Sequence, residues 1–419
     1  MITDILYRCP NCGVMDWCKD GKCISCGATL ELVSRTQVSI SGEIRPVGEW
    51  YDRVLSFDID IPEAGPVLKS KKVRLSEEST KGIYTGYAGI VSTHYVRKPI
   101  SDGRLELFGD RLEFIGDSKG SRTLGIKDML AVTIESDTLQ IVSHEYAPLF
   151  FDFLEESGKK WEDCLRRIIK DHYSEDIIEF CPRIRKRGWL EKPRPAAGHE
   201  KLRAPVRTWR RAEHPLFYAI VKRLIKIALS AAFKIKVEGI ENIPKSGPVV
   251  LLPNHCSFLD SIILVPFSPR KIWFMAKNSE YKSGIHKFLM GIAGSFPVRR
   301  YTTDFQAVRN AIRVIQEGHV LGIFPEGERC WDNRLLPYKI GTIRLILALG
   351  HDVIPVGVSG AYALMPRWTH DIKRVPITIR IGKPVNLGHI PVPKQTMNDI
   401  QAASEKLKAA MTELIGGDF

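Results

Sequence analysis

The feature that most constrains the fold of this chain is an unbroken apolar run at residues 249–252, Val-Val-Leu-Leu. Runs without alternating polar residues are typical of strands that are buried on both faces, as in parallel sheets. Asn254 and His255 follow where the strand is expected to end, and Ser257 is expected to cap a helix that begins near Phe258. The junction therefore places a histidine in a loop of the kind that often carries function.

Asp260 follows His255 by five residues and falls in the first turn of the expected helix. A carboxylate at this spacing can accept the N–H of one imidazole nitrogen, which leaves the other nitrogen able to take a proton. An ordinary histidine pKa of about 6.5 suits a general base near neutral pH. The alternative is a loop histidine that lies beside a helix-capping aspartate.

Three later segments have the same form, an apolar run that ends at a proline or a glycine: residues 294–300, 320–329 and 353–360. The alternation of strands and helices from residue 235 onward predicts an α/β domain. Parallel sheets collect functional groups at the carboxyl ends of their strands. Arg300 and Arg329 would then meet His255 at one edge and form an anion site, because arginine binds phosphate through paired hydrogen bonds.

Four motifs in this region resemble the four sequence blocks of the glycerolipid acyltransferase family. These are PlsC-like enzymes that acylate lysophosphatidic acid or glycerol-3-phosphate. The resemblance extends over residues 237–387. The motifs are, in order, Asn-His-x4-Asp, Gly-x-x-Pro-Val-x-Arg, Phe-Pro-Glu-Gly-x-Arg and Val-Ile-Pro-Val.

The resemblance implies that His255 is the general base and that Asp260 orients it. It implies a phosphorylated acceptor, a lysophospholipid such as 1-acylglycerol-3-phosphate, that is bound by Asn254, Arg300, Glu326, Gly327 and Arg329. The acyl donor would be acyl-CoA or acyl-carrier protein, and the reaction would need neither a metal nor a covalent intermediate. The alternative function is a non-catalytic membrane or nucleic-acid adaptor with an inactive acyltransferase fold.

One position departs from the family pattern. The family usually has threonine or serine between the glycine and the arginine of the third motif, and this chain has Glu328. A carboxylate that faces the phosphate would repel it, whereas one that points away would be expected to pair with Arg344 or Lys339. The departure leaves the identity of the acceptor open more than the type of reaction.

Near the start of the chain, two Cys-x2-Cys pairs are separated by ten residues: Cys9, Cys12, Cys23 and Cys26. Each pair sets two thiolates on a tight turn and supplies half of a tetrahedral zinc shell. The pattern resembles a small zinc ribbon, and because four thiolates leave no open position, the zinc would be structural. Cys18 is expected to be a bystander. The alternative is a set of free or disulfide-bonded thiols.

The sequence of residues 35–181 predicts a β-rich domain that ends in one helix. Alternating apolar residues predict strands at 105–108, 111–115, 139–142 and 150–153. The helix that follows should bury one face, formed by Trp161, Cys164, Leu165, Ile168 and Ile169. This order resembles a pleckstrin-homology or GRAM-like domain, which implies binding of a lipid headgroup or a protein. The alternative is a β-rich module of another kind.

The net charge of +13 is concentrated in a basic stretch. Residues 183–211 contain eleven Lys or Arg against two acids, a composition that favours anionic membrane surfaces. Nucleic-acid binding is an alternative interpretation of this composition, but it is not expected. The simplest alternative is a solvated linker without a binding role. The helix expected at 216–233 is apolar around most of its surface with one basic stripe, which suits a helix lying in a membrane interface or a core helix.

The chain is thus expected to be a multidomain protein: a zinc ribbon at 1–34, a β-rich domain at 35–181, a basic linker at 182–214 and an α/β acyltransferase domain at 215–419. No signal peptide is expected, because cysteines follow the first few residues, and no apolar run is long enough to span a membrane. We therefore expect a cytoplasmic protein that is peripheral on the cytoplasmic face of a membrane.

Overall fold

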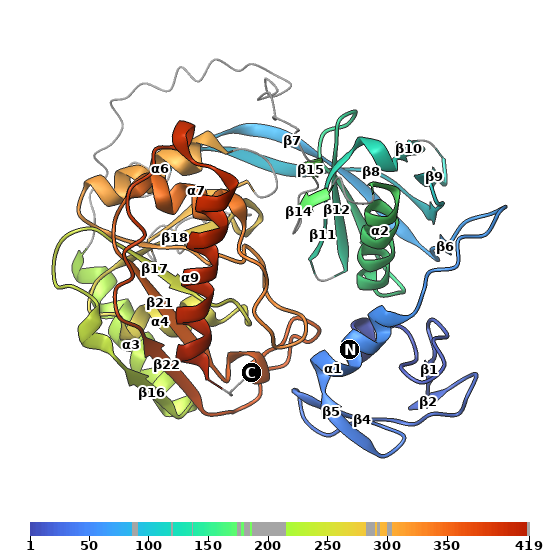
Figure 1. The fold of residues 1–419 in the computed structure, drawn as a ribbon, viewed down its shortest axis with the longest axis horizontal. Helices are drawn as coiled ribbons and strands as arrows, with labels where there is room; N and C mark the ends of the chain where they lie inside the picture. The colour runs from blue at the N-terminus through green and yellow to red at the C-terminus, as the bar shows by residue number, and fades with distance from the viewer. Residues whose placement is uncertain are drawn as a thin grey trace. The chain divides into compact units, whose positions relative to one another are not determined.

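The computed structural model describes residues 1–85, 91–118, 120–135, 137–173, 177–179, 185–186, 215–281, 290, 294–299 and 304–416. The chain divides into two compact units (Figure 1). The N-terminal unit comprises residues 1–29, 51–81 and 95–210, and the C-terminal unit comprises residues 30–50, 82–94 and 211–419. The predicted boundaries at residues 34, 181 and 214 stay predictions, but residues 30–50 group with the C-terminal unit and not with the ribbon or the β-rich domain.

A seven-stranded sheet forms the centre of the C-terminal unit, as the alternation of strands and helices predicted. Its spatial order is β16-β22-β21-β17-β20-β18-β19. The five strands from β21 to β19 run parallel, whereas β22 is antiparallel to β21. The strands are β16 (Ile235–Glu238), β17 (Val249–Pro253), β18 (Ile272–Lys277), β19 (Ser295–Val298), β20 (Val320–Gly322), β21 (Val353–Ser359) and β22 (Ile377–Ile381).

Helices cover both faces of this sheet, and Figure 1 shows α7 and α9 in front of it. Val250 and Leu252 of β17 pack in one core with residues of α6, α7 and α9, whereas Val249 and Leu251 pack in the other with residues of α4 and α8. Burial of each such side chain stabilises the fold by about 1.5–3 kcal/mol, which explains the unbroken apolar run. The helices are α4 (Asp260–Phe267), α6 (Phe305–Gln316), α7 (Ile340–Leu349), α8 (Ala361–Leu364) and α9 (Met397–Ile415).

The helix after His255 begins later than the sequence predicted. Its first residue is Asp260 and its N-cap is Leu259, so the predicted start near Phe258 with Ser257 as the cap is wrong. The Ser257 hydroxyl instead accepts the backbone N–H of Leu259 at 3.3 Å and donates to the backbone carbonyl of Met365 at 3.2 Å. The carboxylate of Asp260 accepts the backbone N–H groups of Cys256 and Ser257, which fixes the turn before the helix.

A small antiparallel sheet belongs to the C-terminal unit although it lies early in the chain. It consists of β3 (Leu30–Leu32), β4 (Gln37–Ile40) and β5 (Glu43–Pro46), and α1 (Val47–Ser56) begins directly after it. The indole N–H of Trp50, which is 2% exposed, donates to the carbonyl of Val38 at 2.9 Å. This buried bond ties the first turn of α1 to the small sheet.

Helix α3 (Pro215–Ala232) has no buried residue. Its amine groups attach it to the unit, since Lys222 donates to the carbonyl of Ser268 and Lys226 lies over the ring of Phe267. Six of its apolar residues are exposed by 36–74%: Leu216, Phe217, Ile220, Leu224, Ile225 and Ile227. The interpretation as a core helix is therefore wrong. Among the described residues, no helix combines the length and hydropathy needed to cross a membrane.

The N-terminal unit contains an eight-stranded sheet and one long helix, as its sequence predicted. The order is β10-β9-β8-β7-β13-β12-β11, with β6 also paired to β8. The five apolar residues expected on one face of the helix are each at most 2% exposed. The elements are β6 (Leu68–Lys69), β7 (Val73–Thr85), β8 (Val91–Leu107), β9 (Arg111–Gly116), β10 (Arg122–Gly125), β11 (Met129–Glu135), β12 (Thr138–Ser143), β13 (Leu149–Phe153) and α2 (Gly158–Tyr173). The resemblance to pleckstrin-homology domains stays a prediction.

Two further pairs of short strands belong to the N-terminal unit. Strands β1 (Cys18–Lys19) and β2 (Lys22–Cys23) form a hairpin beside the cysteines. Strands β14 (Ile177–Glu179) and β15 (Arg185–Lys186) form the other pair. The latter pair falls in and beside the predicted basic linker, most of which lies outside the described residues.

Candidate functional site

Two of the four motifs meet at one edge of the central sheet. Strand β17 leads into Asn254 and His255, and its parallel neighbour β20 leads into the Glu326–Arg329 motif. Because neighbouring parallel strands end at the same edge, their exit loops lie side by side. The backbone N–H of His255 confirms this, since it donates to the Glu326 carboxylate at 3.1 Å.

The predicted pair of His255 and Asp260 is present. The Nδ1 atom of His255 lies 2.8 Å from Oδ2 of Asp260. The same carboxylate oxygen accepts the backbone N–H groups of Cys256 at 2.8 Å and Ser257 at 2.9 Å, and Asp260 is only 1% exposed. An acceptor carboxylate at this position favours the tautomer that carries its proton on Nδ1, so Nε2 is the nitrogen suited to accept a proton.

Ring stacking adds a second constraint on the histidine. The imidazole of His255 stacks on the ring of Phe324, with centroids 4.0 Å apart and planes inclined by 20°. Phe324 in turn stacks on Phe274 of β18 at 5.4 Å. The His255 side chain keeps 13% of its surface exposed. The ring is thus held between a carboxylate and an aromatic face, while part of it still meets solvent.

The side chain of Asn254, which was predicted to bind substrate, is completely buried. Its Oδ1 atom accepts the backbone N–H of Val358 at 2.7 Å, and its Nδ2 atom donates to the carbonyl of Val358 at 3.2 Å. The amide therefore pairs with the backbone of β21 in the way that another strand residue would. This pairing aligns the end of β17 just before His255.

Glu326, also predicted to bind substrate, is 0% exposed and binds backbone groups of this chain. Its Oε1 atom accepts the N–H of His255, and its Oε2 atom accepts the N–H of Leu336 at 3.0 Å. Burial raises the pKa of Glu326 to about 8, although the two backbone donors act in the opposite direction. The carboxyl group thus joins the exits of β17 and β20 from inside the protein.

Glu328, the departure from the family pattern, is only 4% exposed and pairs with two cations. Lys339 Nζ lies 2.9 Å from Oε1, and Arg367 Nη1 lies 3.2 Å from Oε2. Of the two predicted partners, Lys339 is correct and Arg344 is wrong, because the Arg344 side chain donates instead to Gln395 at 3.4 Å. The carboxylate is therefore engaged within the protein.

Arg367 is the residue of this site that the sequence did not reveal. Its guanidinium donates to the backbone carbonyl of Arg329 at 2.8 Å as well as to Glu328, and it stacks over the Trp331 ring at 4.4 Å. It lies outside all four motifs, and 39 residues separate it from Glu328. No spacing or periodicity links residues so far apart, so the sequence offered no signal for this contact.

Gly327 and Arg329 complete the described part of the third motif. Gly327 has φ +68°, and a Cβ atom there would lie 2.9 Å from Cε of Lys339, so this position needs glycine for its backbone and for the lysine stem. Arg329 is intermediate in exposure. Arg300, the other arginine predicted to bind phosphate, lies outside the described residues.

Cys256 follows His255 directly in the chain, but its side chain is poorly suited to act as a nucleophile. It is buried with Cys330 and Tyr362. The pKa of the Cys256 thiol is well above its usual value. The main cause is a hydrogen bond with Cys330, and burial is the second cause. A thiol that resists deprotonation is a poor nucleophile.

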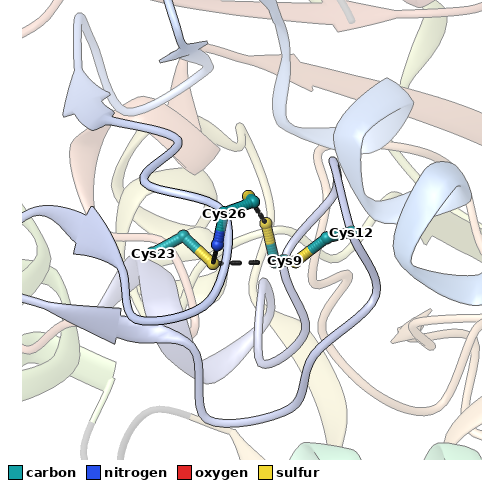
Figure 2. Close-up of side chains that lie close together, drawn as sticks. All are labelled: Cys9, Cys12, Cys23 and Cys26. Carbon is teal, nitrogen blue, oxygen red and sulfur yellow. Dashed lines mark hydrogen bonds between the residues drawn. The ribbon is translucent and has the colours of Figure 1, made fainter.

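The four N-terminal cysteines predicted to hold zinc come together (Figure 2). Their sulfur atoms all lie within 4.8 Å of one another, and the distances are 3.8 Å for Cys9–Cys26 and 3.7 Å for Cys12–Cys23. A tetrahedron with metal–sulfur distances of about 2.3 Å has edges of about 3.8 Å, so the donor set fits zinc. Cys18 is not part of the group.

The cysteine-bearing segment packs with helix α2 inside the N-terminal unit. Lys160, which is 4% exposed, donates to the carboxylate of Asp16 at 2.8 Å, and the Ser157 hydroxyl donates to the carbonyl of Asp4 at 2.7 Å. The nearby Trp17 is 1% exposed, and its indole donates to the carbonyl of Leu6. Loss of a metal from this segment should therefore disturb α2 as well.

We expect the purified protein to contain about one zinc ion per chain, because four thiolates complete a tetrahedral shell. Cys9→Ser should remove the metal and lower the unfolding temperature of the N-terminal unit, since metal binding contributes to folding. Elemental analysis and calorimetry measure the two effects, and Cys18→Ser is the matched control. A metal-free protein whose stability does not respond to Cys9→Ser would contradict the assignment.

Comparison with known proteins agrees with these motifs. Residues 234–359 match the family described as Acyltransferase. A chloroplastic 1-acyl-sn-glycerol-3-phosphate acyltransferase of Arabidopsis thaliana is 29% identical over 171 residues, which are 40% of this chain and 48% of that protein. A 1-acyl-sn-glycerol-3-phosphate acyltransferase of Bacillus subtilis is 25% identical over 202 residues, 47% of this chain and 98% of that protein.

The chain spans about half the length of the curated plant relatives that it matches. Among solved structures, that of the 1-acyl-sn-glycerophosphate acyltransferase PlsC from Thermotoga maritima is similar at 24% identity, covering 47% of this chain and 79% of that one, with a TM-score of 0.38. A score this low carries no weight for the fold. By sequence, the similarity to acyltransferases lies in the C-terminal part of the chain, at residues 234–359.

Proposed function

We propose that this protein is an O-acyltransferase that moves a fatty acyl group from acyl-CoA or acyl-carrier protein to the free hydroxyl of 1-acylglycerol-3-phosphate in phospholipid biosynthesis. The observation that carries the proposal is the His255–Asp260 pair, held at the edge of the sheet where the Glu326–Arg329 motif also ends. The match of residues 234–359 to an acyltransferase family supports it.

In the proposed reaction, Nε2 of His255 takes the proton of the acceptor hydroxyl while the oxygen attacks the thioester carbonyl. The tetrahedral intermediate collapses, its carbon–sulfur bond breaks, and the thiolate leaves with the proton returned by His255. Asp260 keeps the imidazole in the correct tautomer and stabilises its charged form between these steps. Every atom transferred comes from the two substrates, so the step needs no further reactant.

The remaining motif residues divide into two proposed roles. Arg329, and Arg300 outside the described residues, would hold the phosphate of the acceptor and so position its hydroxyl. Asn254 and Glu326 would position the histidine through the backbone, because the structure gives both side chains backbone partners. This second role replaces direct substrate contact for those two residues.

The test is an assay of thiol release by the full-length protein. Acyl-CoA is the donor, and lysophosphatidic acid, glycerol-3-phosphate and lysophospholipids with larger headgroups are offered separately as acceptors. We expect release to depend on an acceptor, with 1-acylglycerol-3-phosphate among those used. A protein that releases thiol with none of these acceptors, from either acyl-CoA or acyl-carrier protein, would refute the proposed function.

Arg329→Lys should raise the KM for a phosphate-bearing acceptor about tenfold while the KM for the acyl donor stays within about twofold. The lysine keeps the charge but loses the paired hydrogen bonds that a guanidinium makes with phosphate. Steady-state kinetics with each substrate varied in turn measure the difference. Arg309→Lys, at an exposed position of α6, is the control. An unchanged acceptor KM would remove Arg329 from the phosphate site.

We further propose that α3 binds the protein to an anionic membrane surface from the cytoplasmic side. Its exposed apolar side chains would enter the interface, and Arg223, an exposed cation of the same helix, would meet anionic headgroups. The full-length protein should sediment with vesicles that contain anionic lipid, and Leu224→Glu should weaken this. Equal sedimentation of both proteins would exclude α3 as the attachment.

A further inference from the structure

The small sheet of residues 30–46 places one arginine against the part of the C-terminal unit that carries Arg367. Arg35 lies in the turn between β3 and β4, and its Nη1 atom donates to the backbone carbonyls of Ala363 at 3.4 Å, Leu364 at 2.5 Å and Asp371 at 2.9 Å. These acceptors are 328–336 residues later in the chain. One guanidinium thus joins both ends of residues 363–371, here called the Arg367 loop.

The contact has a clear physical reason. Helix α8 is only four residues long, so its last carbonyls have no partners within the helix. A cationic side chain at the C-terminal end of a helix donates to such carbonyls and is favoured by the helix dipole. Arg35 supplies this cationic side chain for the carbonyls of α8, and it also donates to the backbone carbonyl of Asp371 at the other end of the loop.

The turn that presents Arg35 is itself fixed. The Ser34 hydroxyl accepts the backbone N–H groups of Thr36 at 3.2 Å and Gln37 at 3.0 Å, which closes the turn around Arg35. The N–H of Val47 donates to the carbonyl of Thr36 at 2.9 Å and ties the start of α1 to the same turn. A guanidinium on a closed turn can hold a loop in place without losing much side-chain freedom per bond.

The Arg367 loop leads directly to the candidate acceptor site. Its central residue, Arg367, is 4% exposed and donates both to Glu328 and to the backbone carbonyl of Arg329. Two residues earlier, the carbonyl of Met365 accepts the hydroxyl of Ser257, whose own N–H binds Asp260. A displacement of this loop would therefore also shift the backbone of Arg329 and the turn between His255 and Asp260.

From these contacts we propose that Arg35 is a positioning residue of the acyltransferase site: it holds the Arg367 loop and, through Arg367, sets the peptide of Arg329 for the acceptor. The acceptor part of this inference rests on the proposed function. Both Arg35 and the Arg367 loop lie outside the segment that matches the acyltransferase family. A hairpin from the N-terminal region of the same chain would thus hold a loop that follows the family-matched segment.

The first test follows the loop itself by amide hydrogen exchange in the full-length protein without substrates. In Arg35→Gln, exchange should become about tenfold faster in peptides that contain Met365 and Lys373, whose N–H groups bind Ala361 and Leu364, and also in those that contain Cys330, whose N–H binds His255. The matched control is Arg45→Gln, at a partly exposed arginine of the same small sheet that pairs with Glu43 and Glu49.

The second test is kinetic. Arg35→Gln should raise the acceptor KM about tenfold, with kcat and the donor KM within about twofold, because misplacement of a phosphate-binding arginine weakens acceptor positioning. Arg35→Lys retains one charged donor and should recover part of both effects. Arg45→Gln should match the wild type in both assays.

Two results would overturn the inference. If Arg35→Gln exchanges at the wild-type rate in these peptides, Arg35 does not hold the loop. If exchange accelerates but the acceptor KM stays unchanged in an active enzyme, the loop does not position the acceptor site. A wild-type protein that uses no acceptor would refute the proposed function and the acceptor part of the inference with it, while the exchange experiment would still decide whether Arg35 positions Arg329.

Discussion

His255→Ala should reduce acyl transfer by roughly 10²–10⁴-fold while the protein stays folded, because the variant lacks the proposed general base. The imidazole is bonded to Asp260 at 2.8 Å and stacked on Phe324, so the reaction depends on one fixed ring. The measurement is kcat with the best acceptor, and circular dichroism checks the fold. His351→Ala, which changes a histidine outside this site, is the matched control.

Asp260→Asn should also reduce acyl transfer strongly. The asparagine side chain can donate its own N–H to Nδ1 of His255 and so favour the tautomer in which Nε2 carries the proton and cannot accept one. Asp260 also accepts two backbone N–H groups, so its variant needs the same check of the fold. The assignment of the base would be wrong if both His255→Ala and Asp260→Asn kept near-normal turnover with every acceptor that the wild type uses.

Glu328→Thr should destabilise the C-terminal unit by about 3–5 kcal/mol, because it leaves a buried cation without its partner. The Arg367 side chain is 2% exposed and lies 3.2 Å from Glu328, which also pairs with Lys339. Threonine is the residue usual in the family at this position, yet here it should impair the fold and not improve the use of lysophosphatidic acid. Chemical denaturation of the full-length protein measures the change.

A second substitution separates the ion pair from other causes. In the double variant Glu328→Thr/Arg367→Met, the buried charge is removed with its partner, so much of the lost stability should return. Methionine can also pack against Trp331, over which the guanidinium stacks. Glu241→Thr, at an exposed position, is the control. If Glu328→Thr alone were as stable as the wild type, Glu328 would not be the partner that Arg367 needs.

The sequence by itself determined the features that depend on short spacing. Asp260 reaches His255 because it follows only five residues later, after a single turn of the chain. Within each Cys-x2-Cys pair, the two cysteines are close because they lie on the same tight turn. The unbroken apolar run of β17 and the buried face of α2 follow from the same local periods, 2.0 residues for a strand and 3.6 for a helix. Such patterns are visible without knowledge of the rest of the chain.

Tertiary structure alone decided which partner each polar side chain has. Glu326 was expected to face the acceptor, but the meeting of β17 and β20 buries it between two backbone N–H groups. Glu328 pairs with Arg367, and Arg35 reaches the Arg367 loop across more than three hundred residues of sequence. No local period relates residues so distant, since their separation is set by how strands and loops pack. The sequence therefore determined the pair of His255 and Asp260, and the packing of the loops around it determined what positions that pair and its neighbouring arginine.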